Sequence, residues 1–151
     1  MHDDERARAS GQRPVSHAPE GAPDAPAAPA VPGRFFGLDI PFMTHIGLVP
    51  LSLEDDVCRT RLPLAPAIVN SRGDVHGGVI AAAFDFTLSG AARAHDAHAY
   101  GVITVDLTTH YYEAARTDLT FVARATRRGR SLVFCDGDAF DGDDRLHGGR
   151  G

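Results

Sequence analysis

The chain has little cysteine, no tryptophan, no long apolar run and no excess of positive charge. Its two cysteines, Cys58 and Cys135, lie in alternating apolar stretches, which predicts buried free thiols and argues against a disulfide framework. No stretch approaches the roughly 20 apolar residues of a membrane span, and the apolar core of a signal peptide is missing. The formal net charge of -5 argues against a general nucleic-acid binder. We therefore expect a soluble cytoplasmic protein with no nucleic-acid partner and no membrane partner.

The N-terminal part differs in composition from the rest of the chain. It includes "HAPEGAPDAPAAPAVP", which is rich in Pro and Ala and has hardly any large apolar side chain. Such a segment cannot bury enough apolar surface to offset the entropy that it would lose on folding. We predict a disordered leader over residues 1–33 and one folded domain over residues 34–151.

Hydrophobic periodicity predicts the elements of the folded part. Residues 34–48 suggest a short helix or turn, and the Ala-rich run at 75–94 is apolar nearly all round, which predicts a long, largely enclosed helix. Alternating stretches predict strands within 51–62 (around an acidic turn at 54–56), 100–115, 117–128 and 131–140, with "RLHGGRG" as a short edge strand. Strands gathered around one long helix imply an α+β fold with an antiparallel sheet.

The segment "DVHGGVIAAAFD", residues 74–85, places two glycines at the start of the predicted helix. The first backbone N–H groups of a helix have no intrahelical partner, and the helix dipole favours negative charge there. Because Gly77 and Gly78 have no side chains, a ligand oxygen could approach these N–H groups as in an oxyanion hole. Alternatively, the glycines only ease a tight turn or a close contact between helix and sheet.

The same helix carries one carboxylate, Asp85, among apolar neighbours. A carboxylate in apolar surroundings costs several kcal/mol unless it is paired or reaches a polar cleft. Asp85 is therefore a candidate for catalysis. The structural alternative is a buried Asp that bonds a nearby hydroxyl, such as that of Thr87 or Ser89.

Taken together, these residues form a recognisable ordered set. Asn70 precedes His76-Gly77-Gly78, Asp85 follows on the helix, and the strand-like "YGVITVDLTTHYYEAA" and the hairpin "RRGRSLVF" come later. The set resembles the hotdog-fold acyl-CoA thioesterases of the phenylacetyl-CoA thioesterase-like group (4-hydroxybenzoyl-CoA thioesterase superfamily), over residues 42–146. The resemblance implies a hotdog fold, in which a curved antiparallel β-sheet wraps a long central helix.

The resemblance also implies a hydrolytic mechanism for acyl-CoA or aryl-CoA thioesters. The Gly77 N–H would polarise the thioester carbonyl, and Asp85 would act as a general base on water or as a nucleophile. Asn70 would help to hold the water or substrate, and Thr104 would orient the same water. His76 would mainly fix the loop by hydrogen bonding.

Binding of the CoA end requires cations, and the basic residues around Gly129 form the most concentrated basic patch of the folded part. A guanidinium can pair with phosphate oxygens through two hydrogen bonds. A solvated hairpin tip is the alternative interpretation of this patch. The expected substrate-binding residues are Gly78, Arg128, Gly129, Arg130 and Ser131.

Further expectations concern assembly and cofactors. The resemblance implies a homodimer or homotetramer with active sites at the dimer interface, so that Asp85 of one subunit faces Asn70 and Gly77 of another. We expect no cofactor, and no metal site. "DGDAFDGDD" has Asp141 where a calcium loop requires Gly and His147 where it requires Glu, while His95 and His98 lack clear companion ligands for zinc.

Two other functions fit the same sequence. A hotdog protein could bind acyl-CoA without hydrolysing it, or it could serve only in oligomerisation. Dehydratases of this fold use a differently placed His–Asp or His–Glu pair, and that motif is missing here.

Overall fold

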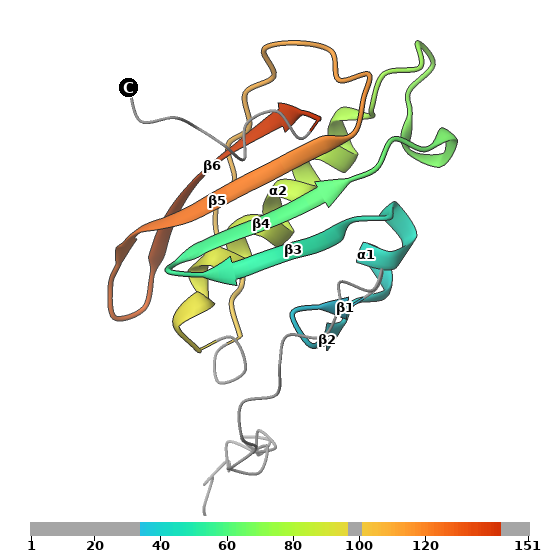
Figure 1. Cartoon of the computed structure of the whole chain (residues 1–151). Coiled ribbons are helices and arrows are strands. Elements are labelled where there is room, and N and C mark those ends of the chain that lie inside the picture. The colour runs from blue at the N-terminus through green and yellow to red at the C-terminus, as the bar shows by residue number, and fades with distance from the viewer. Residues whose placement is uncertain (1–33, 97–100, 143–151) are drawn as a thin grey trace, which may run out of the picture.

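The computed structural model describes residues 34–96 and 101–142, drawn in colour in Figure 1. The expected leader and the expected edge strand at "RLHGGRG" lie outside the described residues. The elements, in chain order, are β1 (Arg34–Phe35), β2 (Leu38–Asp39), α1 (Pro41–Ile46), β3 (Val49–Glu54), β4 (Val57–Leu62), the 3-10 helix η1 (Pro66–Ile68), α2 (Gly77–Ala92), the 3-10 helix η2 (Ala94–Asp96), β5 (Leu119–Arg128) and β6 (Val133–Asp141).

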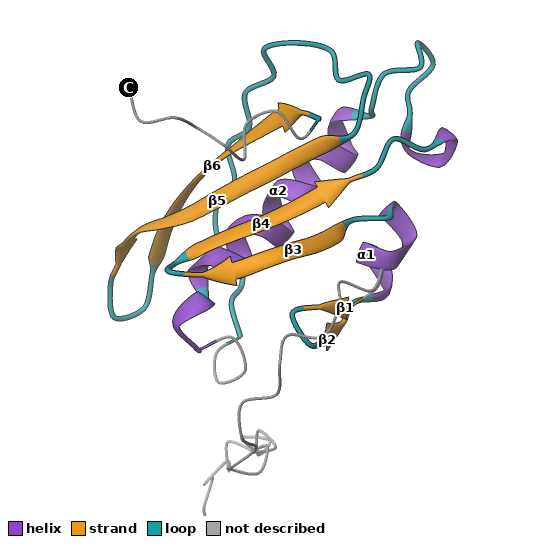
Figure 2. Cartoon of the chain, in the orientation of Figure 1, coloured by secondary structure: helices purple, strands orange, loops and turns teal. Residues whose placement is uncertain are grey.

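The four longer strands form one antiparallel sheet in the order β3-β4-β5-β6. Figure 2 shows the long helix α2 lying across one face of this twisted sheet. The short hairpin β1–β2 and α1 lie beside the β3 end. This is the predicted α+β hotdog arrangement of one long helix against a curved antiparallel sheet.

The turn between β3 and β4 confirms the acidic turn expected at 54–56. Its two central residues, Asp55 and Asp56, have φ angles of 49° and 62°. Two consecutive residues with positive φ are the signature of a type I′ turn, whose twist suits the strands of a tight hairpin. Asp tolerates this conformation better than most residues, which explains why an acidic pair joins these strands.

Helix α2 forms where it was predicted, two residues shorter at each end. Within it, every residue except Gly78 is buried or half-buried. The core between helix and sheet includes fully buried Phe121 and the edge-to-face pair of Phe84 and Phe121, with ring centroids 5.0 Å apart. The apolar composition of the helix therefore reflects contacts on most of its sides.

The strand expected over 100–115 is wrong for the described part of that range, because residues 101–118 contain no strand. A strand needs a neighbour for its N–H and C=O groups, whatever the β-propensity of its side chains. Here a cleft separates the segment from β6, and Ile103 and Val105 remain 91% and 81% exposed. The alternation of the sequence is real, but no described strand pairs with it.

Gly90 sets the distance between α2 and β4. A Cβ atom at this position would lie 2.6 Å from the Sγ of Cys58 and 3.0 Å from the Phe35 ring. Cys58 is a fully buried free thiol, as predicted, and burial raises its pKa to about 12. Cys135 is also free but half-buried. The helix packs this closely because residue 90 has no side chain.

Gly90→Ala should destabilise the protein by about 1–3 kcal/mol, because the added methyl overpacks the core. This cost should outweigh the gain of up to about 1 kcal/mol in helix propensity. Urea denaturation measures the change, and the Cys58→Ala background is the control because it removes the clashing sulfur. An alanine variant as stable as the parent would show that close packing at Gly90 is not required, and an equal cost in both backgrounds would show that the Cys58 sulfur is not the source of the clash.

Candidate functional site

The start of α2 leaves one backbone amide unused. His76 is the N-cap residue, and its Nδ1 accepts a hydrogen bond from the Gly78 N–H at 3.0 Å. Tyr111 donates its hydroxyl to the Gly77 carbonyl oxygen at 2.8 Å. The Gly77 N–H has no hydrogen-bond partner among the residues that the structure describes. This N–H is therefore available to an oxyanion at the positive end of the helix.

The loop before α2 is held in place by Asn70. Its Oδ1 accepts hydrogen bonds from the backbone N–H groups of Arg72, at 2.8 Å, and Asp74, at 3.3 Å. Gly73 allows the turn by adopting a φ of 84°. Beyond the turn, Val75 donates its N–H to the Ala115 carbonyl at 2.8 Å. In this arrangement the Asn70 oxygen orders the loop that leads to Gly77.

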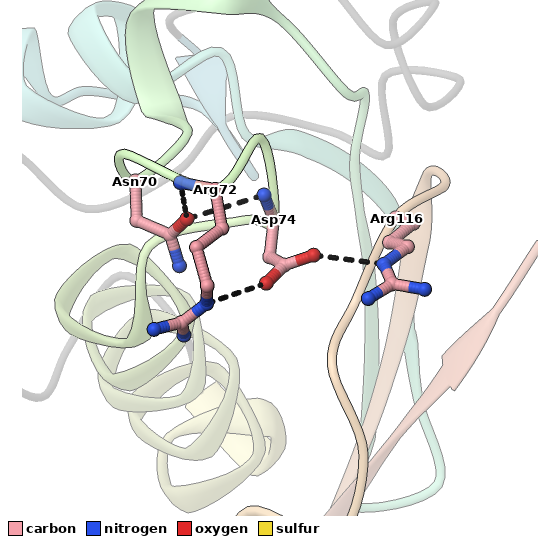
Figure 3. Close-up of polar contacts among 4 residues, drawn as sticks. All are labelled: Asn70, Arg72, Asp74 and Arg116. Carbon is pink, nitrogen blue, oxygen red and sulfur yellow. Dashed lines mark hydrogen bonds and ion pairs between the residues drawn. The ribbon is translucent and has the colours of Figure 1, made fainter.

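A buried carboxylate lies in the same loop and was not among the predicted site residues. Figure 3 shows Asp74 between two arginines: Arg116 Nε donates to Oδ1 at 2.8 Å, and Arg72 Nε donates to Oδ2 at 3.2 Å. The hydrogen bond from Arg116 is the main reason that the pKa of Asp74 lies below its usual range, and Arg72 lowers it further. No local pattern in the sequence marks this cluster, since Arg116 is 42 residues away from Asp74.

Asp85 lies half-buried on α2 and accepts a hydrogen bond from the hydroxyl of Thr104. The structure thus brings together two of the predicted site residues, which are 19 positions apart. The proposed structural partner Thr87 is not available to Asp85. Its hydroxyl pairs with Thr60 and donates to the Ala83 carbonyl, both at 2.7 Å.

The predicted site residues line two clefts. A cleft of about 1260 Å³ is lined by Asp85, Thr104 and Ser131, among others. A second cleft, of about 590 Å³, is lined by Asn70, Gly77 and Gly78. The two clefts share residues 111–115 and Ile80 as a common wall.

Asp85 and Gly77 lie well apart on the helix of a single chain. They are eight positions apart on α2, which at 1.5 Å per residue is roughly 12 Å along the helix axis. A general base and an oxyanion donor must both come within hydrogen-bond reach of the reacting group. The separation of Asp85 and Gly77 along α2 is several times the length of a hydrogen bond.

Arg128 corrects the expected CoA-binding patch. Its guanidinium binds Asp56, with Nη2 2.6 Å from Oδ1, and donates to the carbonyl oxygens of Ala91, at 3.0 Å, and Ala92. It therefore ties the C-terminus of α2 to the β3–β4 turn, and it holds the pKa of Asp56 below its usual value. This committed side chain does not form part of an open phosphate site. Gly129, Arg130 and Ser131 remain exposed at the hairpin tip.

Two further features bear on function. Among the described residues, no group of three or more His, Cys, Asp or Glu side chains could hold a metal ion. No helix in the described part of the chain is long and apolar enough to cross a membrane.

Comparisons with known proteins give a consistent result. The family model for the thioesterase superfamily matches residues 72–147. No curated protein matches the chain. Among solved structures, a conserved protein from Pseudomonas aeruginosa is 29% identical, with a TM-score of 0.64 over 68% of this chain and 82% of that one.

Two more solved structures show the same fold at lower identity. A thioesterase family protein from Silicibacter pomeroyi is 21% identical, with a TM-score of 0.64 over 68% of this chain and 76% of that chain. A phenylacetic acid degradation-related protein from Ralstonia eutropha is 20% identical, with a TM-score of 0.63 over 72% of this chain and 85% of that chain.

Proposed function

Because this chain belongs to the thioesterase superfamily, we propose that it hydrolyses acyl-CoA or aryl-CoA thioesters to a free acid and CoA. The observation that carries the proposal is the position of Asp85 and its contact with Thr104. This carboxylate lines a large cleft, accepts a hydrogen bond from Thr104, and lies on the helix whose first amide, at Gly77, has no partner within residues 34–96 and 101–142. Superfamily membership supports thioester hydrolysis in general, and these residues support the more specific mechanism.

In the proposed reaction, the Gly77 N–H donates to the thioester carbonyl oxygen and stabilises the negative charge that develops there. Asp85 takes a proton from water, and the oxygen of that water attacks the carbonyl carbon. The C–S bond then breaks, and the CoA thiolate leaves and is protonated. In the other form of the mechanism, Asp85 attacks the carbon itself, expels the thiolate and forms an anhydride that water hydrolyses.

We further propose that two copies of the chain form the complete site, with Asp85 from one copy and Gly77 from the other. The roughly 12 Å between these residues on one helix supports this arrangement. The larger cleft also carries a group of exposed apolar side chains that a second copy could cover: Ile103, Val105, Tyr112, Leu132 and Phe134. Monomeric proteins seldom leave such groups open to water.

A thiol-release assay with a panel of CoA esters tests the function. The panel should include aromatic, short-chain and medium-chain acyl groups, since Phe84 and Tyr111 line the larger cleft. We expect release of CoA thiol from at least one ester. Binding of the esters without thiol release would contradict hydrolysis and favour an acyl-CoA-binding protein.

A further inference from the structure

We propose that Arg72 and Arg116, together with the buried Asp74 between them, form the site that binds the phosphates of the CoA carrier. The inference rests on the proposed function and adds the residues that recognise the anionic half of the substrate. In this proposal Arg72 and Arg116 take the phosphate-binding role that was expected of Arg128, whose guanidinium binds Asp56 and the end of α2.

Both arginines have N–H groups that do not contact Asp74. Each contacts Asp74 through Nε, and neither has a further partner among the described residues. Their side chains are 77% and 75% exposed, so the Nη groups face solvent. A guanidinium that is held by Nε alone can still offer its remaining N–H groups to phosphate oxygens.

Asp74 holds the two arginines together. Its side chain is 5% exposed, and each of its carboxylate oxygens forms an ion pair with one arginine. A charge buried to this extent is stabilised by its partners, and it fixes the direction of both guanidiniums before any ligand arrives. Two positive charges against one negative charge leave the cluster with an excess of one positive charge. All 15 basic residues of the chain are arginines, so no lysine could serve instead.

The position of the cluster suits the proposed chemistry. Arg72 and Asp74 line the 590 Å³ cleft that also contains Gly77, at the N-terminal end of α2. Arg128 contacts the opposite end of this 16-residue helix, which lies roughly 24 Å away. Arg72 therefore lines the same cleft as the Gly77 N–H at which the thioester carbonyl is proposed to bind.

One carboxylate in the same cleft should weaken the binding of phosphate. Glu113 is exposed and lines the same cleft. It should repel phosphate weakly, because exposed charges are screened by solvent and salt. Its removal should therefore have an effect of the opposite sign to removal of an arginine.

The test measures kinetics with a CoA thioester that the wild-type chain hydrolyses and with the N-acetylcysteamine thioester of the same acid, which has no phosphate. Arg72→Gln and Arg116→Gln should each raise KM for the CoA ester about tenfold, which corresponds to one charge-assisted hydrogen bond. We expect little change in kcat, and no matching rise in KM for the short thioester. Glu113→Gln should lower KM for the CoA ester.

Arg124→Gln is the matched control. Arg124 is exposed on β5, and its substitution removes the same charge at a place away from the proposed site. Arg72→Lys and Arg116→Lys retain the charge and should recover part of the lost affinity. An equal rise in KM for both esters, or a rise caused by Arg130→Gln but not by the two arginine variants, would overturn the inference. Failure of the wild-type chain to hydrolyse any thioester would instead contradict the proposed function, and binding of CoA compared with pantetheine would then test the arginines directly.

Discussion

Asp85→Asn should lower kcat for thioester hydrolysis by about 10²–10⁴, the usual contribution of a general acid or base. The amide keeps the shape of the side chain, and its oxygen can still accept the hydrogen bond from Thr104. It cannot take a proton from water, nor attack a carbonyl carbon as a carboxylate does. KM should change much less than kcat, because the amide alters the chemical step more than the binding of substrate.

Ser89→Ala is the matched control for this variant. Ser89 lies one turn beyond Asp85 on α2 and lines the same cleft, but it has no part in the proposed reaction. Steady-state kinetics and a thermal melt of both variants separate loss of chemistry from loss of fold. A fully active Asp85→Asn enzyme would remove Asp85 from the mechanism in both of its forms.

Gly77→Pro should lower kcat by about 10²–10³, the loss seen when one oxyanion-hole donor is removed. Proline has no N–H, and it is well tolerated at the first position of a helix. The preceding residue, His76, has a ψ of 129°, which is compatible with a following proline. The substitution therefore removes the proposed donor while leaving the helix able to form.

Gly77→Ala is the control, because alanine retains the N–H. A Cβ at this position would lie 3.5 Å from the Tyr111 ring, which is an ordinary contact. We expect the alanine variant to keep most of its activity. If the proline and alanine variants lose activity to the same extent, the side-chain space at residue 77 matters and the amide donor does not.

Local signals predicted the elements of this fold well. The helix at Gly77–Ala92, the acidic hairpin turn and the hairpin of β5 and β6 depend on periodicity and turn chemistry within short windows. The strand expected over 100–115 failed because pairing needs a partner, and no local pattern supplies one. The residue types indicate that these side chains suit a strand, but they do not indicate which edge of a sheet the strand would pair with.

The site was predictable only in part, for the same reason. The glycines of residues 77–78 and Asp85 stand out by their chemistry in an apolar stretch. By contrast, the partners of Arg128 lie 36 to 72 residues away, and Arg116 lies 42 residues from Asp74. Arg128 of the expected basic patch proved to have a structural role, and no motif marked the exposed pair of Arg72 and Arg116.

Subunit mixing tests the central claim, that Asp85 of one copy and the Gly77 N–H of another act on one thioester. Asp85→Asn and Gly77→Pro chains, each nearly inactive alone, are unfolded together in urea, refolded and assayed. Random pairing into twofold dimers makes half of the dimers mixed, each with one intact site of two, so about a quarter of wild-type activity should return. If the mixture stays as inactive as its components while forming mixed dimers, both residues must serve the same chain's site and the shared site is wrong.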